Sequence, residues 1–417
     1  MIGSLWMIVR HSLRRHALST TVTVLSAALA SGLVLAVFSL SAQSTRAFVG
    51  GKLGFDAVLG ARGSALQLVL NTVYHLETSP GNIPWSLYEQ MREDPRVERA
   101  VPYAVGDSYR GRRVVGTTPE LFELEVREGE PYRIEAPGRV FDPGYREAVI
   151  GATVARELGL ALNAKFQPAH GVGHGAHDHS ERYTVVGVLE PTNSPADRVL
   201  WIPIEGVYHM EGHVGRDESG REIEASHEEG VPHEFREVSA VLLKLRGGQA
   251  GFFLSNEINR KRKDATLAWP IAKPMADLML KLGWVNRVLE LVAYLVVAVA
   301  AGSLLASLYN TMNERRREFA VLRALGARRR TVFGAIVLEA GTIAGMGALL
   351  GYLVYFAILV GVADVVRSRT GVVLDKTLLH PSFWWTPLAM VGIGALSGLL
   401  PAFKAYATDV ASHLSGA

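Results

Sequence analysis

Cysteine is absent from this chain of 417 residues, and its absence removes several classes of function. Without thiols there can be no disulfide framework, no thiolate metal site and no cysteine nucleophile. Basic and acidic residues nearly balance, so the net charge is only +3 at pH 7. So small an excess of basic residues gives no reason to expect nucleic acid as a ligand.

Motifs for nucleotide binding and hydrolysis are missing as well. The sequence has no G-x-x-x-x-G-K-[ST] phosphate loop, no H-E-x-x-H motif and no G-x-S-x-G motif. His227 and His233 each precede a glutamate, but neither is followed by the second histidine of a zinc protease. We therefore expect a chain that is not an enzyme, with ATP and Mg²⁺ bound by a partner subunit.

Long apolar runs are absent from the region 46–283 but flank it on both sides. The runs 17–42, 283–310, 331–362 and 381–403 have the length that a membrane-spanning helix needs. A secretory signal peptide is the competing interpretation of the first run, but the apolar core of such a peptide has only about 7–15 residues. We predict four spans, the first of them uncleaved.

Arginines indicate which ends of these spans are cytoplasmic. Three precede the first span, and seven lie between the second and the third: Arg315, Arg316, Arg317, Arg323, Arg328, Arg329 and Arg330. Both termini are therefore predicted inside. The segments between the spans are a cytoplasmic amphipathic lead 1–16, an outer domain 43–282, a cytoplasmic helix 311–330, an outer loop 363–380 and a cytoplasmic tail 404–417.

The outer domain 43–282 has the pattern of a mixed α+β fold. Short apolar runs predict strands at 112–116, 148–151, 183–189, 199–204 and 238–245, and helices are expected at 84–93 and 153–160. The segment 253–281 is predicted as a helical stalk that prolines interrupt. The predicted fold class is an α-helical membrane protein with four transmembrane helices and a mixed α+β domain between the first and the second.

The string N-T-M-N-E-R-R-R-E-F-A-V-L-R-A-L-G-A at 310–327 is the most informative stretch of the chain. Its apolar residues Phe319, Leu322 and Leu325 recur at helical spacing, and Gly326 offers a helix stop. This pattern predicts an amphipathic helix across the cytoplasmic ends of two spans. The alternative is a basic loop that only fixes the topology.

This string, followed by an apolar run with an early Glu339, resembles the FtsX-type permease core of the MacB-like ABC transporter family (type VII, mechanotransmission). Segments 115–122, 150–155 and 185–189 are similar to the periplasmic core domain of that family. Residues 160–166 depart from its pattern, which usually has a Gly-Asp turn there. The resemblance covers essentially the whole chain and implies a multi-pass protein of the bacterial inner membrane.

The resemblance further implies partners and a docking site. The helix 311–330 would be the coupling helix, which docks on a cytoplasmic ABC ATPase subunit. A second permease subunit, identical or different, and a periplasmic binding or adaptor protein are the other expected partners. The expected coupling residues are Glu314, Arg315, Arg316, Arg317, Glu318, Phe319, Leu322, Arg323, Leu325 and Gly326.

Glu339 lies within the third predicted span, and an acid in that position is a functional candidate by default. The family often has a glutamate here. We expect a structural bond from Glu339 to the arginines at 315–317 or 328–330.

Eight of the thirteen histidines lie within 170–233, in two inserts (170–181 and 209–233) that the family pattern does not require. Imidazoles with acidic neighbours are typical zinc ligands. The candidate zinc ligands are His170, His174, His177, His179, His209 and His213. Solvated loops that bind metal only loosely, or a pH sensor, are the alternatives.

Three functions compete at this point. The first is a permease that uses ATP hydrolysis in a partner to export or extract a substrate, with a link to zinc. The second is a non-transporting transducer, similar to FtsX, that activates a periplasmic partner. The third is a membrane-anchored periplasmic metal sensor.

Overall fold

A computed structural model describes residues 2–49, 53–171, 177–210, 213–216, 221–225, 230–315, 318–319, 321, 323, 326–370 and 380–407. The chain divides into two compact units. The helical unit contains Met1–Ser44, Leu282–Asp364 and Asp375–Ala417. The sheet unit contains Thr45–Lys281 and Val365–Leu374.

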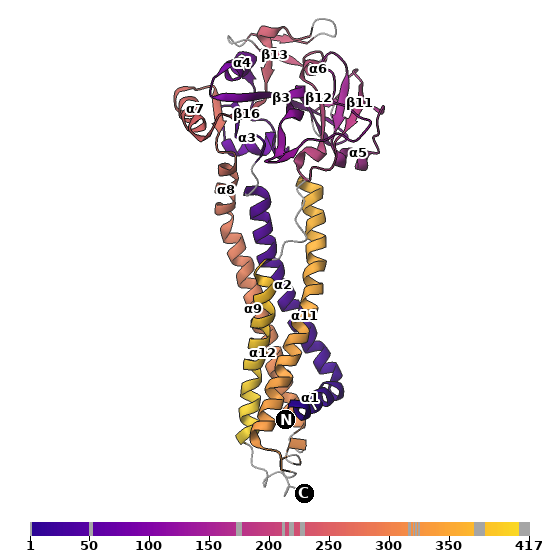
Figure 1. Ribbon diagram of the computed structural model, residues 1–417, viewed down its shortest axis with the longest axis vertical. Helices are drawn as coiled ribbons and strands as arrows, with labels where there is room; N and C mark the ends of the chain where they lie inside the picture. The colour runs from indigo at the N-terminus through magenta and orange to yellow at the C-terminus, as the bar shows by residue number, and fades with distance from the viewer. Residues whose placement is uncertain are drawn as a thin grey trace. The chain divides into compact units, whose positions relative to one another are not determined.

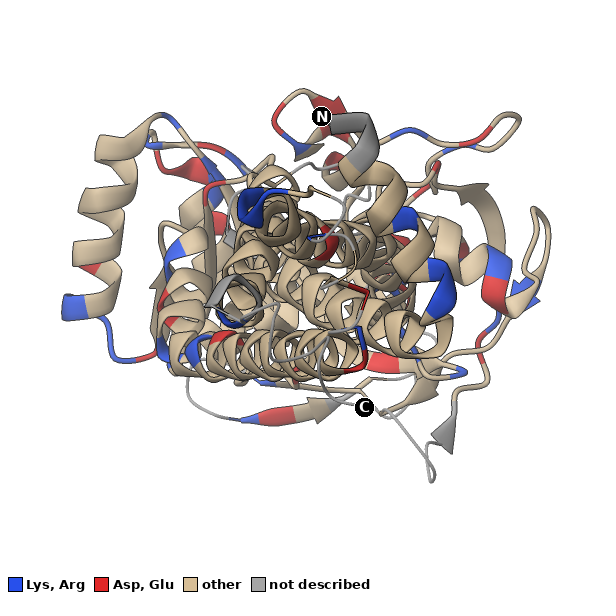
Figure 2. Ribbon diagram, turned by 90° about the horizontal axis from the view of Figure 1, so that it is seen from below, with Lys and Arg blue, Asp and Glu red and all other residues tan. Residues whose placement is uncertain are grey.

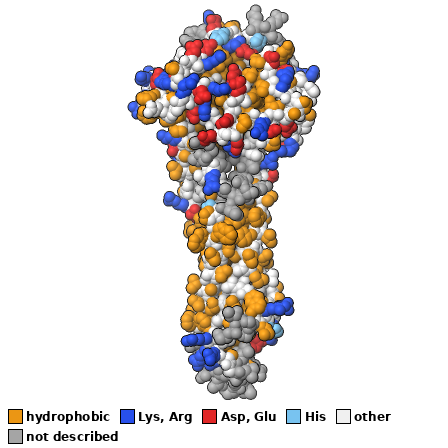
Figure 3. All heavy atoms as spheres, viewed as in Figure 1, with side chains coloured by type: hydrophobic (Ala, Val, Ile, Leu, Met, Phe, Trp, Pro, Cys, Tyr) orange, Lys and Arg blue, Asp and Glu red, His pale blue; other side chains and the backbone are white. Residues whose placement is uncertain are grey.

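Among the described residues, five helices with defined bounds belong to the helical unit, and the four longest are seen roughly end-on in Figure 2. The five are α1 (Ile2–Arg15), α2 (Ala17–Val49), α9 (Gly283–Glu314), α11 (Arg329–Thr370) and α12 (Ser382–Ala407). In the described part of the chain, four helical segments are long and apolar enough to cross a membrane: Ala17–Arg46, Gly283–Glu314, Arg329–Ser368 and Ser382–Lys404. Large apolar side chains cover their outer surface (Figure 3), which suits a lipid environment. The predicted fold class, with four transmembrane helices, is confirmed.

Small residues let the helices of this unit approach closely. A Cβ added at Gly347 of α11 would lie 2.4 Å from the Cβ of Ala27 in α2, and one at Gly351 would lie 2.7 Å from the Cβ of Ser31. A Cβ at Gly394 of α12 would lie 2.3 Å from the Cβ of Ala344. Such contacts are typical of helix packing in membranes, where van der Waals contact replaces the hydrophobic effect between helices.

The helix α11 is longer than the third span predicted from the sequence. It continues from 362 to Thr370, through part of the predicted outer loop 363–380. Residues 363–370 contain neither glycine nor proline, so nothing in them ends the helix. Residues 371–379 lie outside the described part of the chain.

The sheet unit is built on one mixed sheet of eleven strands, visible in the upper part of Figure 1. Its strand order is β17-β1-β16-β3-β4-β12-β7-β11-β8; off this path, β9 pairs with β3, and β10 pairs with β9. The strands of this sheet are β1 (Ala57–Ala61), β3 (Val97–Tyr109), β4 (Arg112–Thr117), β7 (Glu147–Ile150), β8 (Lys165–Phe166), β9 (Ala169–His170), β10 (His177–Asp178), β11 (Tyr183–Val188), β12 (Val199–Pro203), β16 (Ala240–Leu245) and β17 (Ala265–Ala268).

Short helices and strand pairs complete this unit. The helices are α3 (Ala65–Thr72), α4 (Trp85–Glu93), α5 (Ala152–Leu158), α6 (Ile204–Tyr208), α7 (Gly248–Lys261) and α8 (Ala272–Lys281), with 3-10 turns at Pro119–Glu123, Pro195–Arg198 and His233–Phe235. The two-stranded pairs are β2 (Ile83–Pro84) with β15 (Glu237–Val238), β5 (Glu125–Arg127) with β6 (Glu130–Pro131), and β13 (Val214–Arg216) with β14 (Glu222–Glu224).

Strand β3 connects the two halves of the sheet. Its first half pairs with β16, and its second half pairs with β4 and then β9. Apolar side chains gather in two buried clusters, among them Leu59 and Ile202 in one and Val101 and Trp201 in the other. Because the end of β3 lies within this core, a side chain on it has a fixed position.

The predicted stalk at 253–281 is wrong over its first half. Helix α7 buries Leu254 and Ile258, and β17 pairs with β1 as an edge strand of the sheet. All four residues of β17 are buried, so the segment belongs to the globular core. Only α8 (Ala272–Lys281) remains as a separate helix after Pro270.

Candidate metal centre

Asp107 lies near the end of β3, where the strand departs from regular pairing. The register between β3 and β4 shifts between Val105 and Asp107, which is a bulge at Gly106. A bulge re-aims the side chain that follows it. The backbone N–H of Gly171 donates to the carbonyl of Gly106 (2.9 Å), which holds the bulge against the segment after β9. The Asp107 carboxylate is thereby placed inside the unit, with the residue only 4% exposed.

His170 reaches Asp107 by strand pairing. The two residues are opposite each other in the antiparallel β3–β9 pair, so their side chains share one face of the sheet. The Nδ1 of His170 lies 3.2 Å from the Asp107 Oδ1. The His170 side chain is 56% exposed, which sets it apart from the other members of the cluster.

His179 follows β10 and is buried. Its backbone N–H donates to the carbonyl of Pro168 (3.0 Å), and its own carbonyl accepts from the side-chain amide of Gln167. These bonds turn the ring inward, so that its Nε2 lies 3.2 Å from the Asp107 Oδ1.

His213 comes from the segment between α6 and β13. Its carbonyl accepts a bond from the N–H of Ala225 (2.7 Å), which fixes the backbone. Its Nε2 lies 3.3 Å from the Asp107 Oδ2. Apart from this ion-pair contact, the nitrogen has no hydrogen-bond partner among the described residues. A buried nitrogen without a partner is costly unless a ligand satisfies it.

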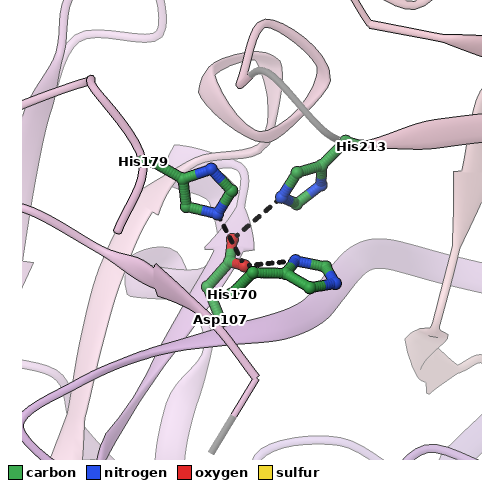
Figure 4. Close-up of side chains that lie close together, drawn as sticks. All are labelled: Asp107, His170, His179 and His213. Carbon is green, nitrogen blue, oxygen red and sulfur yellow. Dashed lines mark hydrogen bonds and ion pairs between the residues drawn. The ribbon is translucent and has the colours of Figure 1, made fainter. Parts of the chain in front are cut away.

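Together, the three imidazoles surround one carboxylate (Figure 4). The four donor atoms all lie within 4.8 Å of one another. The imidazole nitrogens of His170 and His179 each lie 3.2 Å from the Asp107 Oδ1, and that of His213 lies 3.3 Å from the Oδ2. In a tetrahedral zinc site with bonds of about 2.0 Å, two donor atoms are about 3.3 Å apart. Three neutral imidazoles and one carboxylate are a donor set that suits Zn²⁺. The cluster is therefore a buried Asp/His₃ group that could bind a metal ion.

Electrostatics keep the carboxylate ionised. Burial alone would raise the pKa of Asp107, but the contacts with His170, His179 and His213 outweigh it and hold that pKa well below its usual range. The hydrogen bond to Asp107 in turn raises the pKa of His170. A charged carboxylate is the form that ligates a cation.

The structure brings together only some of the predicted zinc ligands that it describes. It brings together His170, His179 and His213, whereas the Nδ1 of His209 faces the carbonyl of Glu205 (2.9 Å), away from the cluster. His177 is paired with His170 in the β9–β10 ladder. The side chain of His177, and His174 altogether, lie outside the described residues.

Asp107 was missed by sequence reasoning. It precedes His170 by 63 residues, and no spacing rule joins the two. The signal was an aspartate inside an otherwise strand-like run directly after Gly106, because strands are depleted in aspartate and interior glycines mark bulges.

A second polar cluster lies in the helical unit, at the cytoplasmic helix ends. The Nη1 of Arg315, directly after α9, lies 3.2 Å from the Oε2 of Glu339 in α11 and donates to the Oγ of Ser12 in α1 (2.6 Å). Ser12 also donates to Glu339. Arg315 and Glu339 are each 6% exposed. The expected bond from Glu339 to the first arginine group is thus present through Arg315.

Glu318 and Phe319, two other residues predicted to couple to an ATPase, contact Arg315 of this cluster. Glu318 pairs with Arg315 (3.2 Å) and with Arg15 of α1, and Glu314 lies 3.4 Å from His16. Phe319 is buried with the Arg315 guanidinium over its ring, Arg323 is helical and Gly326 has a φ of +98°. The predicted coupling residues Arg316, Arg317, Leu322 and Leu325 lie outside the described residues.

The sequence matches two known protein families over most of its length. Residues 20–250 match the family described as MacB-like periplasmic core domain, and residues 290–410 match the FtsX-like permease C-terminal family. The chain belongs to the MacB/FtsX-like permease family. Membership places it in the bacterial inner membrane, with the sheet unit as a periplasmic domain.

Permeases of this family are typically not enzymes; they work with a cytoplasmic ATPase and dimerise. Among solved structures, the periplasmic region of MacB from Actinobacillus actinomycetemcomitans is 10% identical, with a TM-score of 0.33, and the match covers 56% of this chain and 95% of that one. The extracellular domain of the ABC-type transporter YknZ from Gram-positive bacteria is 13% identical, with a TM-score of 0.29, over 51% of this chain and 99% of that one. No curated protein matches the chain.

Proposed function

We propose that this MacB/FtsX-like permease is the membrane subunit of an ABC system that handles zinc. ATP hydrolysis in a separate cytoplasmic subunit acts on the stretch 314–326, and the motion reaches the periplasmic domain, which extracts or exports a substrate. The periplasmic domain binds Zn²⁺ at Asp107, His170, His179 and His213. The observation that carries the zinc assignment is the convergence of four metal donors on one point.

The origin of the four donors supports a dedicated site. They come from β3, β9, the residue after β10 and the segment before β13, and backbone bonds hold each segment. A loose histidine-rich loop would draw its ligands from one stretch only. The buried carboxylate matters most, because it supplies the negative charge that a cation needs in a site shielded from water.

Contacts at the cytoplasmic helix ends support the coupling part of the proposal. The Arg315 guanidinium bonds to Ser12 and Glu339, which belong to two other helices. Removing one partner of a buried ion pair typically costs about 3–5 kcal/mol. A push on the residues after Arg315 therefore moves α1, α9 and α11 together.

Zinc titration calorimetry on the purified full-length chain tests the metal part of the proposal. We expect one Zn²⁺ per chain with sub-micromolar affinity. Asp107→Asn combined with His179→Ala removes the carboxylate and a buried imidazole, so this variant should lose stoichiometric binding. His233→Ala is the matched control, since this histidine is exposed and pairs with Glu89. The same affinity in all three proteins would refute the assignment.

A second candidate is a transducer that activates a periplasmic partner without moving a solute. The close packing at Gly347, Gly351 and Gly394 favours it, because helices in such contact leave no room for a hydrophilic solute between them. An ATP-dependent complex with a periplasmic enzyme, formed without any extruded substrate, would distinguish this candidate from the first.

A further inference from the structure

The four donors of the metal centre differ sharply in exposure. The side chains of Asp107, His179 and His213 are 4%, 5% and 15% exposed, whereas that of His170 is 56% exposed. A structural zinc site is normally closed on all sides by its ligands, while a site that exchanges a ligand keeps one position open. The centre has three interior donors and one donor at the surface.

The attachment of these donors differs in the same way. Asp107 belongs to the thirteen-residue strand β3, which is paired on both sides within the sheet. His170 ends the two-residue strand β9, which meets β3 through only two opposed pairs, Asp107 with His170 and Ser108 with Ala169. The exposed ligand is therefore on a much shorter element than the buried carboxylate.

We infer that the centre is a zinc exchange site, in which His170 is the ligand that leaves when the ion passes to or from a carrier. This inference rests on the proposed zinc binding at the same four residues. The carrier must present a nitrogen or oxygen donor, such as an imidazole or a carboxylate, at the His170 side of the site. Asp107, His179 and His213 keep hold of the ion while the fourth ligand changes.

The exchange is a ligand substitution without any redox step. A lone pair of the incoming donor forms a bond to Zn²⁺, and the bond from Zn²⁺ to the His170 nitrogen breaks. The imidazole departs neutral, with its electron pair. Zn²⁺ accommodates this because it can expand from four to five ligands and has no geometric preference of its own.

Chelator kinetics on the zinc-loaded, full-length protein in detergent test the inference, with EDTA as the incoming ligand. Attack on an open side makes the rate of zinc removal rise in proportion to the EDTA concentration. A closed site releases zinc at a rate that is independent of EDTA. We expect proportional dependence in the wild type and, in His170→Ala, one zinc per chain with at least about ten-fold faster removal.

The variants separate this inference from the proposal beneath it. His179→Ala should lose stoichiometric zinc, because a buried donor is removed, whereas His233→Ala should behave as the wild type. Wild-type removal that does not depend on EDTA, or equal losses of zinc in His170→Ala and His179→Ala, would overturn the exchange role and leave zinc binding intact. Absence of stoichiometric zinc from the wild type would overturn both.

Discussion

At the scale of single residues, specific neighbours offset the free-energy cost of burying some polar groups in the periplasmic domain, but not of all. Asp107 has three imidazoles around it. His75 is the opposite case, because its Nδ1 is buried and has no hydrogen-bond partner among the described residues. Its ring instead meets the edge of Trp201, at 5.7 Å between ring centroids. Burial and the nearby Arg113 and Arg198 lower the pKa of His75 from 6.5 to about 3.

This shift predicts a pH dependence of stability. Unfolded His75 takes up a proton below about pH 6.5, while folded His75 stays neutral down to about pH 3. Its contribution to stability is therefore complete above pH 6.5 and is lost as the pH falls towards 3, with a slope of up to about 1.4 kcal/mol per pH unit. Thermal unfolding of the wild type and of His75→Leu between pH 7 and pH 5 measures it. The loss on acidification should be smaller in the variant by about 2 kcal/mol; parallel curves would contradict the prediction.

At the scale of elements, glycines in α11 set how close the spans approach. Gly347→Leu is expected to destabilise the helical unit by about 1–3 kcal/mol, because the new side chain meets Ala27 of α2. Gly361→Leu is the matched control on the same helix, since no atom lies within 4 Å of a Cβ there. Thermal unfolding in detergent compares the two variants. Equal midpoints would show that the close contact with α2 contributes nothing.

The buried ion pair between Arg315 and Glu339, which joins the end of α9 to α11, leads to a second prediction about stability. Arg315→Met leaves the Glu339 carboxylate buried without its cation, which should cost about 3–5 kcal/mol. Adding Glu339→Leu removes the orphaned charge, so the double variant should be more stable than the single one. A double-mutant cycle of unfolding free energies checks this. Strictly additive losses would mean that the two side chains do not interact.

Some elements were predictable from the sequence and others were not. The spans follow from length and apolar character, and strands such as β11 and β12 follow from short apolar runs with breakers on both sides. The segment that holds β17 was misjudged, since its role as an edge strand depends on pairing with β1, about 200 residues away in the chain. Asp107 escaped for the same reason: a strand register, and no local spacing, brings it to His170.

At the scale of the whole molecule, the prediction concerns the partner ATPase. Arg316→Glu with Arg323→Glu reverses two charges of the coupling stretch and should abolish co-purification with the ATPase subunit. Arg246→Glu with Arg260→Glu is the control, because it makes the same change of charge on exposed residues of the periplasmic domain. Co-purification from membranes that contain both subunits is the measurement. Retention of the ATPase by the coupling variant would remove the main support for docking at 314–326.

The register between β3 and β9 links metal affinity at the candidate site to the shape of the sheet. Side chains on a strand alternate between the two faces, so a slip of one residue between β3 and β9 would carry His170 to the face opposite Asp107. With zinc bound as proposed, the four ligands can meet the ion in only one register, and by the reciprocity of linked equilibria the bound ion would resist any movement that changes that register. In the proposed zinc-bound state, a pull that shifts β9 by one residue would therefore lower the affinity for zinc, and bound zinc would raise the force needed to shift it.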